Sequence, residues 1–482
     1  MIDLRPIALV AGVLVAMLGA IMLVPALVDL ALDAPNWSVF LISAVITLFA
    51  GGAMTVATWG WSGSLSIRQA FLLTSVVWLL MAGFGALPLY LADAGLGFTD
   101  AAFEAMSGIT TTGSTVIVGL DSLSRGVLLW RALLQWIGGI GFIVMALAVL
   151  PMLQVGGMQL FRIESSDTSE KILPRAAQIA GSIAGVYFAL SVACMVAYLL
   201  AGMETFDAIV HAMTTISTGG FSSHDRSFGY FESHATEVVA VVFMLAGSLP
   251  FILYLQAVRG RPGAIVRDSQ VQWFLGAAAV FIIVAFVYQL IEGIYAAPQA
   301  LRHAAFNVVS VVTTTGYASD DYGTWGAFAP AFFFFIMFTG GCTGGTTGSV
   351  KIFRFQVLFQ HMRVQLARVS YPHGVFTPRF NGRPIPDEAS RSVMAFVLLL
   401  FVCFAVLAAA LGLLGLDSIT AMSAAATAIT NVGPGLGDII GPAGTFAKLP
   451  DAAKWLLSFG MLLGRLEVFT VLVLFTPAFW RN

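Results

Sequence analysis

The stretch Ser310-Val-Val-Thr-Thr-Thr-Gly316 has three relatives elsewhere in the same chain. They read Ser107-Gly-Ile-Thr-Thr-Thr-Gly113, Thr214-Thr-Ile-Ser-Thr-Gly-Gly220 and Thr427-Ala-Ile-Thr-Asn-Val-Gly433. All four align without gaps as a hydroxyl residue, any residue, Ile or Val, Thr or Ser, two variable residues and Gly. Their final glycines are 107, 96 and 117 residues apart (113 to 220, 220 to 316 and 316 to 433). This self-similarity predicts one structural unit used four times.

The composition around these segments is that of a membrane protein. Of 482 residues, 59% are hydrophobic and only 10% are charged, whereas soluble domains carry roughly 25% charged residues. A soluble chain of this length would need more polar surface than these residues supply. The formal net charge of −2 gives no bulk attraction to nucleic acid, so no nucleic-acid partner is expected.

A spanning helix needs about 20 mostly apolar residues. Four semi-polar segments, near 98–118, 205–223, 300–318 and 418–437, are too short and too rich in Thr, Ser and Gly to cross a bilayer. They suit re-entrant loops, because irregular backbone at membrane depth is tolerated where it lines protein or a water-filled cavity. The predicted spans lie near 7–28, 37–59, 70–93, 126–153, 176–202, 236–257, 271–294, 327–360, 392–415 and 453–477.

Each repeat interval contains two spans and one loop in the same orientation. The predicted fold is therefore an all-α polytopic membrane protein with four helix–pore-loop–helix repeats in a pseudo-fourfold arrangement, plus an N-terminal helix pair. The expected division is 1–60 for the helix pair and 61–155, 156–262, 263–370 and 371–482 for the four repeats. The first apolar run continues to about Val28 without a small-x-small cleavage site, so it is interpreted as a retained helix rather than a signal peptide.

The basic residues predict the orientation of the chain. With the N-terminus inside, all but seven of the 23 lysines and arginines fall on the inner side, Lys351 and Arg354 among them. This asymmetry predicts cytoplasmic termini and places all four semi-polar segments outside. The basic connection 361–391 reflects either this bias alone or a docking surface for a cytoplasmic partner. The seven exceptions are Arg125, Arg131, Arg226, Arg302, Lys448, Lys454 and Arg465.

Extending each segment past its glycine indicates a pore. The windows Thr111-Thr-Gly-Ser-Thr115, Thr218-Gly-Gly-Phe-Ser222, Thr314-Thr-Gly-Tyr-Ala318 and Asn431-Val-Gly-Pro-Gly435 can be compared with the TVGYG filter of potassium channels, which the last two match best. A potassium ion entering the membrane must exchange its water for other oxygens. Rings of backbone carbonyls offer these, in dihedrals that glycine adopts cheaply. One such window is only a polar turn, but four in register predict a potassium-selective pathway on one chain.

On these motifs the chain resembles the Trk/Ktr/HKT superfamily of potassium transporters, and most closely its bacterial TrkH branch. The resemblance covers essentially the whole length, including the additional N-terminal helix pair. It implies potassium uptake across the bacterial inner membrane, with potassium as the transported ion and no organic cofactor in this chain. It also implies a homodimer that binds a cytoplasmic, nucleotide-binding TrkA-like regulatory subunit. No nucleotide site is visible here, so nucleotide control would come through that partner.

The resemblance also assigns the ion-coordinating residues. Only one glycine is shared by all four loops, so fewer well-formed ion sites and weaker selectivity over sodium are expected than in a tetrameric channel. The assigned residues are Thr110, Thr111, Thr112, Gly113, Ser217, Thr218, Gly219, Gly220, Thr313, Thr314, Thr315, Gly316, Thr430, Asn431, Val432 and Gly433.

A second glycine-rich stretch lies inside the apolar run 327–360. Thr339-Gly-Gly-Cys-Thr-Gly-Gly-Thr-Thr-Gly-Ser349 has five glycines in eleven residues, too many for an ordinary helix, and its spacing is not that of a phosphate-binding loop. It is either a glycine-packed helix crossing or a broken helix beneath the filter. In the resembling family such a loop acts as the gate, which would assign Gly340, Gly341, Gly344, Gly345, Thr346, Thr347 and Gly348 to it.

Arg465 is a charge within the last predicted span, and an intramembrane charge is costly. Glu467 is close in sequence, but residues two apart on a helix do not face each other. We therefore expect Arg465 to donate hydrogen bonds to carbonyls of the 339–349 loop and to close the pathway, an arrangement that the family resemblance supports.

The remaining polar residues have simpler interpretations. Four residues of the short helices either attract cations to the outer mouth or, as we favour, bond neighbouring helices: Glu104, Asp207, His211 and His303. Three cysteines without metal-ligand spacing are expected to be buried thiols: Cys194, Cys342 and Cys403.

Two other function classes fit the sequence less well. A substrate-coupled secondary transporter also uses broken helices, but such folds often show inverted repeats, whereas these repeats share one orientation. An intramembrane enzyme is disfavoured because no HExxH or GxSxG motif occurs and no acid–base pair recurs at helical spacing.

Overall fold

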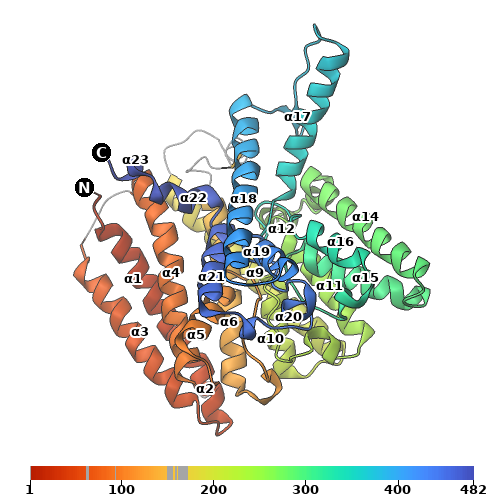
Figure 1. Cartoon of the computed structure of the whole chain (residues 1–482). Helices are drawn as coiled ribbons and strands as arrows, with labels where there is room; N and C mark the ends of the chain where they lie inside the picture. The colour runs from red at the N-terminus through yellow and green to blue at the C-terminus, as the bar shows by residue number, and fades with distance from the viewer. Residues whose placement is uncertain are drawn as a thin grey trace.

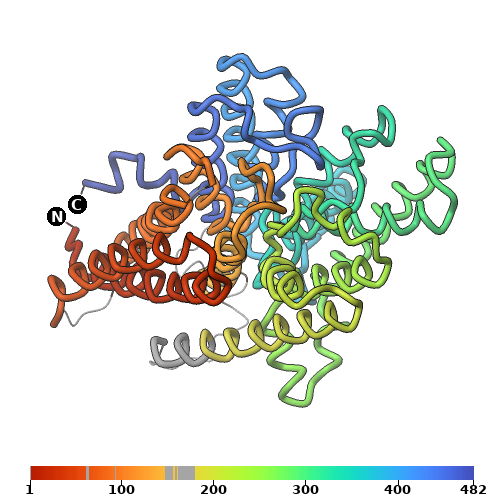
Figure 2. The backbone as a smooth tube through the Cα atoms, turned by 90° about the horizontal axis from the view of Figure 1, so that it is seen from below, coloured from red at the N-terminus to blue at the C-terminus, as the bar shows by residue number. Residues whose placement is uncertain are grey.

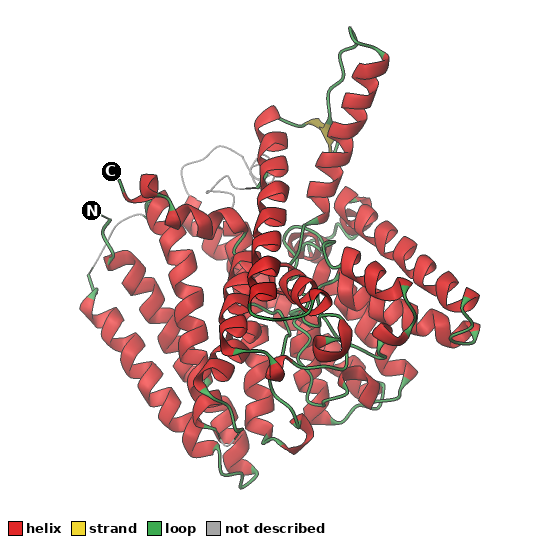
Figure 3. Ribbon diagram, in the orientation of Figure 1, coloured by secondary structure: helices red, strands yellow, loops and turns green. Residues whose placement is uncertain are grey.

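The computed structural model describes residues 2–60, 65–92, 94–148, 156, 157, 160 and 172–481. Helices dominate these residues, and the one sheet among them pairs two short strands, β1 (Arg379–Phe380) and β2 (Arg383–Pro384) (Figure 3). The end of the span predicted near 126–153, past Ala148, lies outside the described residues, as does residue 155 at the expected boundary between the first two repeats.

The helices occur in the order that the repeats predict (Figure 1). An N-terminal group is formed by α1 (Arg5–Ile21), α2 (Leu23–Ala31) and α3 (Trp37–Ala57). The first repeat has α4 (Ile67–Leu91), α5 (Phe98–Ile109), η1 (Leu120–Ser122) and α6 (Arg125–Ala148). The second has α9 (Ile172–Leu200), α10 (Thr205–Ile216), η2 (Ser227–Tyr230), α11 (His234–Ser248) and α12 (Phe251–Val258).

The third and fourth repeats follow the same order. The third has α13 (Gly263–Arg267), α14 (Ser269–Ile291), α15 (Ala297–Val312), η3 (Tyr322–Thr324), α16 (Phe328–Ile336) and α17 (Ile352–Ser370). The fourth has α18 (Asp387–Leu413), α19 (Ser418–Thr430), α20 (Gly437–Ile440), η4 (Phe446–Lys448), α21 (Asp451–Arg465), α22 (Val468–Leu472), η5 (Val473–Phe475) and α23 (Pro477–Trp480). The all-α polytopic fold is thereby confirmed, and each repeat contains one short pore helix: α5, α10, α15 or α19.

Burial separates the spanning helices from the pore helices. In α9, α14 and α18 only 22% of the most apolar window is buried, and large apolar side chains such as Leu200 and Leu413 point outward, 84% and 90% exposed. An apolar exterior of this kind suits a lipid environment. The pore helix α19 is the opposite, because every residue from Ser423 to Thr430 is buried.

Three of the ten predicted spans are not continuous helices. The structure has seven long apolar helices and two bent pairs among its described residues. One pair, α11 and α12, bends by 95° at Leu249 and Pro250, where proline removes a helical hydrogen bond. The other bends by 114° after α21, where Glu467 has a φ of +62°. The third, predicted over 327–360, is interrupted between α16 and α17.

The four repeats surround a common centre. In Figure 2 their colours follow one another around the molecule, and the red N-terminal helices lie outside on one flank. Both termini lie toward the end of the molecule from which α17 and the β1–β2 segment project (Figure 1). The pore helices, by contrast, lie within the body, and the C-terminal end of each one leads into one of the four aligned segments.

Candidate pore and gate

The four segments singled out in the sequence follow directly on the pore helices; we call 110–113, 217–220, 313–316 and 430–433 the filter segments. In each one, the residue two before the shared glycine has a left-handed backbone, with φ of 52° at Thr111, 49° at Thr218, 55° at Thr314 and 55° at Asn431. Three of these are threonines, and β-branched residues rarely adopt positive φ. Strain of this kind is retained at functional sites.

The shared glycines close the four segments into a ring. A Cβ atom added to Gly113 would lie 2.3 Å from the carbonyl oxygen of Gly219, and one on Gly220 would lie 1.8 Å from that of Thr315. For Gly316 the neighbour is Val432 at 2.0 Å, and for Gly433 it is Thr112 at 2.8 Å. Each oxygen belongs to the residue before the shared glycine of the next repeat, and the fourth repeat returns to the first. Glycine is therefore required both by its positive φ of 80° to 113° and by this close approach.

Side chains tie neighbouring filter segments together. Ser114 Oγ donates to the carbonyl of Gly433 at 2.7 Å, and Asn431 Nδ2 donates to Thr112 Oγ1 at 2.9 Å. Between the second and third repeats, the buried Tyr317 hydroxyl lies 2.5 Å from Thr214 Oγ1. These bonds fix the loops relative to one another, which a filter of defined diameter requires.

The hydroxyls at the ends of the pore helices are oriented by the helices themselves. Thr110, Thr313 and Thr430 each donate to the carbonyl four residues earlier, at 2.7 Å. This bond uses the hydroxyl proton and leaves lone pairs on the oxygen. A hydroxyl held in that way can present its oxygen to a cation.

One cavity joins all four repeats. It has a volume of about 70 Å³, and Gly113, Gly220, Gly316 and Gly433 all line it, together with Arg131 and residues that follow the first, second and fourth filter segments. The shared glycines thus meet at a single hollow, as a common pathway predicts.

The glycine-rich stretch of the third repeat breaks its helix. α16 ends at Ile336 and α17 begins at Ile352, and the residues between them are not helical. This confirms the broken-helix prediction, and the glycine-packed helix crossing is wrong. We call residues 339–349 the gating loop, after the role that the resemblance to the Trk/Ktr/HKT superfamily implies for them.

The gating loop contacts three of the four filter segments. Gly348 N donates to Thr314 Oγ1 at 2.8 Å, and Thr218 Oγ1 donates to Thr346 Oγ1 at 3.1 Å. A Cβ on Gly348 would lie 2.6 Å from the carbonyl of Thr430. The loop therefore packs directly against the filter and cannot move without breaking these contacts.

Arg465 reaches the gating loop as expected. Its Nη1 donates to the carbonyl of Thr346 at 2.9 Å, and its guanidinium carbon lies 4.0 Å from the centre of the Phe142 ring. The side chain is fully buried, and its Nε and Nη2 have no hydrogen-bond acceptor among the described residues. Glu467 lies beyond the end of α21, at the bend, and pairs with Arg354 at 2.6 Å.

Lys351 and Arg354, which the charge pattern assigns to the inner side, are buried within the protein, 3% and 0% exposed. Arg354 bonds Gly156 and Glu467 and stacks on Phe396. Their position directly after the gating loop is the signal in the sequence that could have indicated their burial.

Among the four short-helix residues, which we expected to bond neighbouring helices, Glu104 does so: it is buried and pairs with Arg131 of α6 at 2.8 Å, while also accepting from Val116 N at 2.9 Å. The other three, Asp207, His211 and His303, instead bond serines of the loops that follow their own pore helices. Cys194 and Cys342 are buried free thiols as predicted, and Cys403 is half-buried.

Two residues of α6 that the sequence did not reveal support the second filter segment. Gln135 Nε2 donates to the carbonyl of Gly219 at 2.6 Å, and its Oε1 accepts from Phe221 N at 3.0 Å. Arg131 Nη1 donates to the carbonyl of Ser222 at 2.9 Å. A polar side chain inside an apolar run is the signal that could have identified them.

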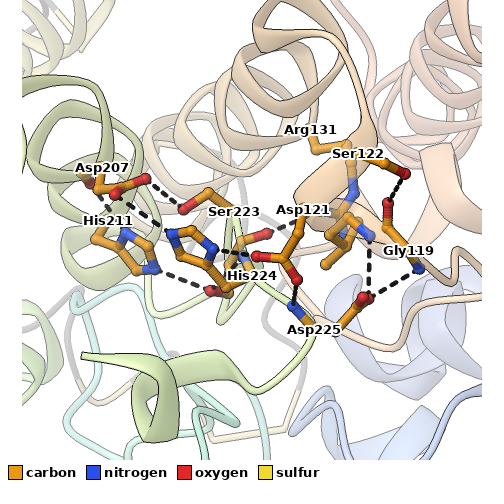
Figure 4. A network of polar contacts seen from close by, with 11 residues as sticks. Gly119, Asp121, Ser122, Arg131, Asp207, His211, Ser223, His224 and Asp225 are labelled. Atoms are coloured by element: carbon orange, nitrogen blue, oxygen red, sulfur yellow. Dashed lines mark hydrogen bonds and ion pairs between the residues drawn. The ribbon is translucent and has the colours of Figure 1, made fainter. Parts of the chain in front are cut away.

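The loops that follow the filter segments of the first two repeats are joined by a polar network (Figure 4). His224 Nδ1 lies 2.5 Å from Asp121 Oδ1, and its Nε2 lies 3.3 Å from Asp207 Oδ2. Partial burial lowers the pKa of His224, but the hydrogen bonds to both carboxylates and their negative charges outweigh it and raise the pKa above its ordinary value. Asp225 Oδ1 accepts from Gly119 N and Leu120 N at 3.1 Å. The network therefore depends on a charged His224.

A ring of four pore loops inside an apolar helical bundle defines a multi-pass membrane transport protein with a pathway through its own chain. The chain belongs to the TrkH family of cation transport proteins, whose family model matches residues 37–482. This membership places it among transport proteins rather than enzymes.

Individual relatives agree with the family assignment. The Trk system potassium uptake protein TrkI of Halomonas elongata is 49% identical over 478 residues, covering 99% of this chain and 97% of the relative. The Trk system potassium uptake protein TrkH of Escherichia coli is 36% identical, covering 99% of both. The crystal structure of the potassium transporter TrkH from Vibrio parahaemolyticus superposes with a TM-score of 0.92 at 36% identity, covering 100% of both chains.

Proposed function

We propose that this protein takes up potassium ions through the ring of four filter segments. The observation that carries the proposal is the closed set of glycine–carbonyl approaches, in which each shared glycine lies against a carbonyl of the next repeat. Backbone carbonyls in a narrow ring replace the hydration shell of potassium. The relatives named above as potassium uptake proteins support the choice of ion.

The filter segments supply the coordinating groups. Carbonyls of the sixteen filter residues form the pathway, and the hydroxyls of Thr110, Thr313 and Thr430, whose protons are already donated to the pore helices, add oxygen ligands at one end. Asn431 and Val432 replace threonines in the fourth segment. The ring is therefore asymmetric in its side chains, and we expect weaker selectivity than in four identical loops.

The gating loop closes the pathway. Its contacts with Thr218, Thr314 and Thr430 support a position beneath the filter, where Arg465 holds its middle by the carbonyl of Thr346. A buried guanidinium there also raises the electrostatic barrier for a cation. Opening requires the loop to leave this position.

We further propose a cytoplasmic membrane location with both termini inside, a homodimer and a cytoplasmic, nucleotide-binding regulatory partner. The support for the partner is the projecting α17 and β1–β2 segment (Figure 1), which exposes Arg363, Arg368 and Arg379. A basic surface of this kind suits an acidic partner surface.

Tracer uptake into liposomes tests the proposed function. Purified protein is reconstituted into vesicles loaded with KCl, and ⁸⁶Rb⁺ uptake is measured against external K⁺ or Na⁺, with protein-free vesicles as the control. We expect K⁺ to compete at about tenfold lower concentration than Na⁺, because the carbonyl ring favours the larger ion. Equal competition would overturn potassium selectivity. Uptake that requires an imposed sodium or proton gradient would instead favour a coupled secondary transporter.

A further inference from the structure

A second buried cation touches the gating loop. Lys351 is the residue directly before α17 and is 3% exposed. Its Nζ donates to the carbonyl of Thr347 and, at 3.0 Å, to Thr347 Oγ1. Arg465, the last residue of α21, donates to the carbonyl of Thr346, so two cations from different parts of the chain hold consecutive residues of the loop.

Both cations share one aromatic ring. The Arg465 guanidinium carbon lies 4.0 Å from the centre of Phe142, and Lys351 Nζ lies 5.0 Å from it. These distances are within the range of a cation–π interaction. Phe142 belongs to α6 of the first repeat, so the ring holds together elements of the first, third and fourth repeats beneath the filter.

The local charge is not balanced. Glu467 is paired with Arg354 at 2.6 Å rather than with either cation. Over the described part of the chain, neither Lys351 nor Arg465 forms an ion pair within 4.0 Å. Burying a charge without an opposite charge is costly. If Lys351 served only to pack, an apolar residue at this position would make the fold more stable.

We propose that Lys351 is a second gate residue, which positions Thr347 in the closed loop and ties that loop to the first turn of α17. The proposal rests on the gating role of the loop given above. Because Lys351 directly precedes the helix that projects from the body, a displacement of α17 acts on the loop through this side chain. Arg465 holds the same loop from the fourth repeat, so each contact alone leaves the gate only partly restrained.

Three substitutions at one position test the role of the charge. Lys351→Met keeps the aliphatic stem but loses the charge and donor, Lys351→Gln keeps a donor, and Lys351→Arg keeps both. We expect the maximal ⁸⁶Rb⁺ uptake rate to rise about tenfold for Met, by less for Gln and little for Arg, since the lost bond involves a charged group. The concentration for half-maximal uptake should stay within about twofold, because the filter is untouched.

Lys454→Met is the matched control. Lys454 is also 3% exposed but pairs with Asp100 at 2.6 Å, away from the gating loop, so its loss should not raise uptake. Folding is checked for every variant by size-exclusion chromatography, and if Lys351→Met does not fold, Lys351→Gln carries the test. Unchanged uptake in the folded neutral variants, or an equal rise in Lys351→Arg, would overturn the proposal.

Arg465→Ala is measured in parallel to separate the two claims. If it raises uptake and the neutral Lys351 variants do not, Lys351 has no gate role while the loop remains a gate. If neither position raises uptake, the gating role of the loop itself fails.

Discussion

The Nη1 atom of Arg465 lies 2.9 Å from the carbonyl oxygen of Thr346, so the last residue of α21 is bonded to the middle of the gating loop. The bond joins the fourth repeat to the third at the point where both of their second helices are broken. We propose that the buried charge restrains the pathway through this contact.

Replacing Arg465 by alanine should increase ion flux. A hydrogen bond to a charged group contributes about 1.5–3 kcal/mol, and about 1.36 kcal/mol corresponds to a tenfold change, so we expect uptake of ⁸⁶Rb⁺ into liposomes to rise about tenfold or more. Arg261→Ala, at an exposed arginine outside the gate, is the control and should leave flux unchanged. Flux that stays the same or falls in Arg465→Ala would contradict the gating role.

Replacing Glu467 by glutamine should destabilise the protein strongly. Glu467 and Arg354 are 7% and 0% exposed, and removing one partner of a buried ion pair costs about 3–5 kcal/mol. Glu232 pairs with Arg226 at 3.6 Å, but both side chains are exposed, so Glu232→Gln should cost about 0–1 kcal/mol. Thermal unfolding in detergent measures both variants, and similar melting temperatures for the two would argue against a structural role for the Arg354–Glu467 pair.

The polar network around His224 should weaken at alkaline pH. The raised pKa of His224 means that its contribution to stability is fully present below its unfolded pKa of about 6.5 and is lost as pH rises through the folded pKa. The hydrogen bond from His224 lowers the pKa of Asp121, so that carboxylate stays charged throughout this range. Hydrogen exchange of the Gly119 and Leu120 amides should therefore be better protected at pH 5.5 than at pH 8.5, after correction for the intrinsic exchange rate.

His224→Gln provides the control for this pH effect. Glutamine can bond one carboxylate but does not titrate, so the difference in protection between the two pH values should disappear. A difference that persists in His224→Gln would assign the effect to another group.

The repeat pattern allowed much of the site to be predicted. Four aligned segments located the filter, the glycine density of 339–349 located the broken helix, and the cost of an intramembrane charge singled out Arg465. Each of these signals can be read from the sequence without knowledge of any contact in space. The potassium-coordinating role of the filter residues remains a proposal.

Other features depend on contacts that no local signal carries. Three of the glycine–carbonyl approaches join residues 95 to 116 positions apart, and the fourth joins Gly433 to Thr112, 321 positions away. Alignment of the loops does not give their order in space. Lys351 and Arg354 look like ordinary inner-side charges until their burial is known. The bend at Pro250 has a visible cause, whereas the one at Glu467 follows from a positive φ that its residue type does not suggest.

The central claim is that the four shared glycines form one conducting ring, and alanine substitution tests it most directly. Gly316→Ala places a Cβ 2.0 Å from the Val432 carbonyl at a φ of +80°, whereas Gly276→Ala meets nothing within 4 Å. With both proteins folded and reconstituted, we predict that Gly316→Ala lowers ⁸⁶Rb⁺ uptake at least about tenfold, since unfavourable backbone conformations alone cost about 1–3 kcal/mol. Gly276→Ala should match the unmodified protein. Wild-type uptake in Gly316→Ala would contradict the account.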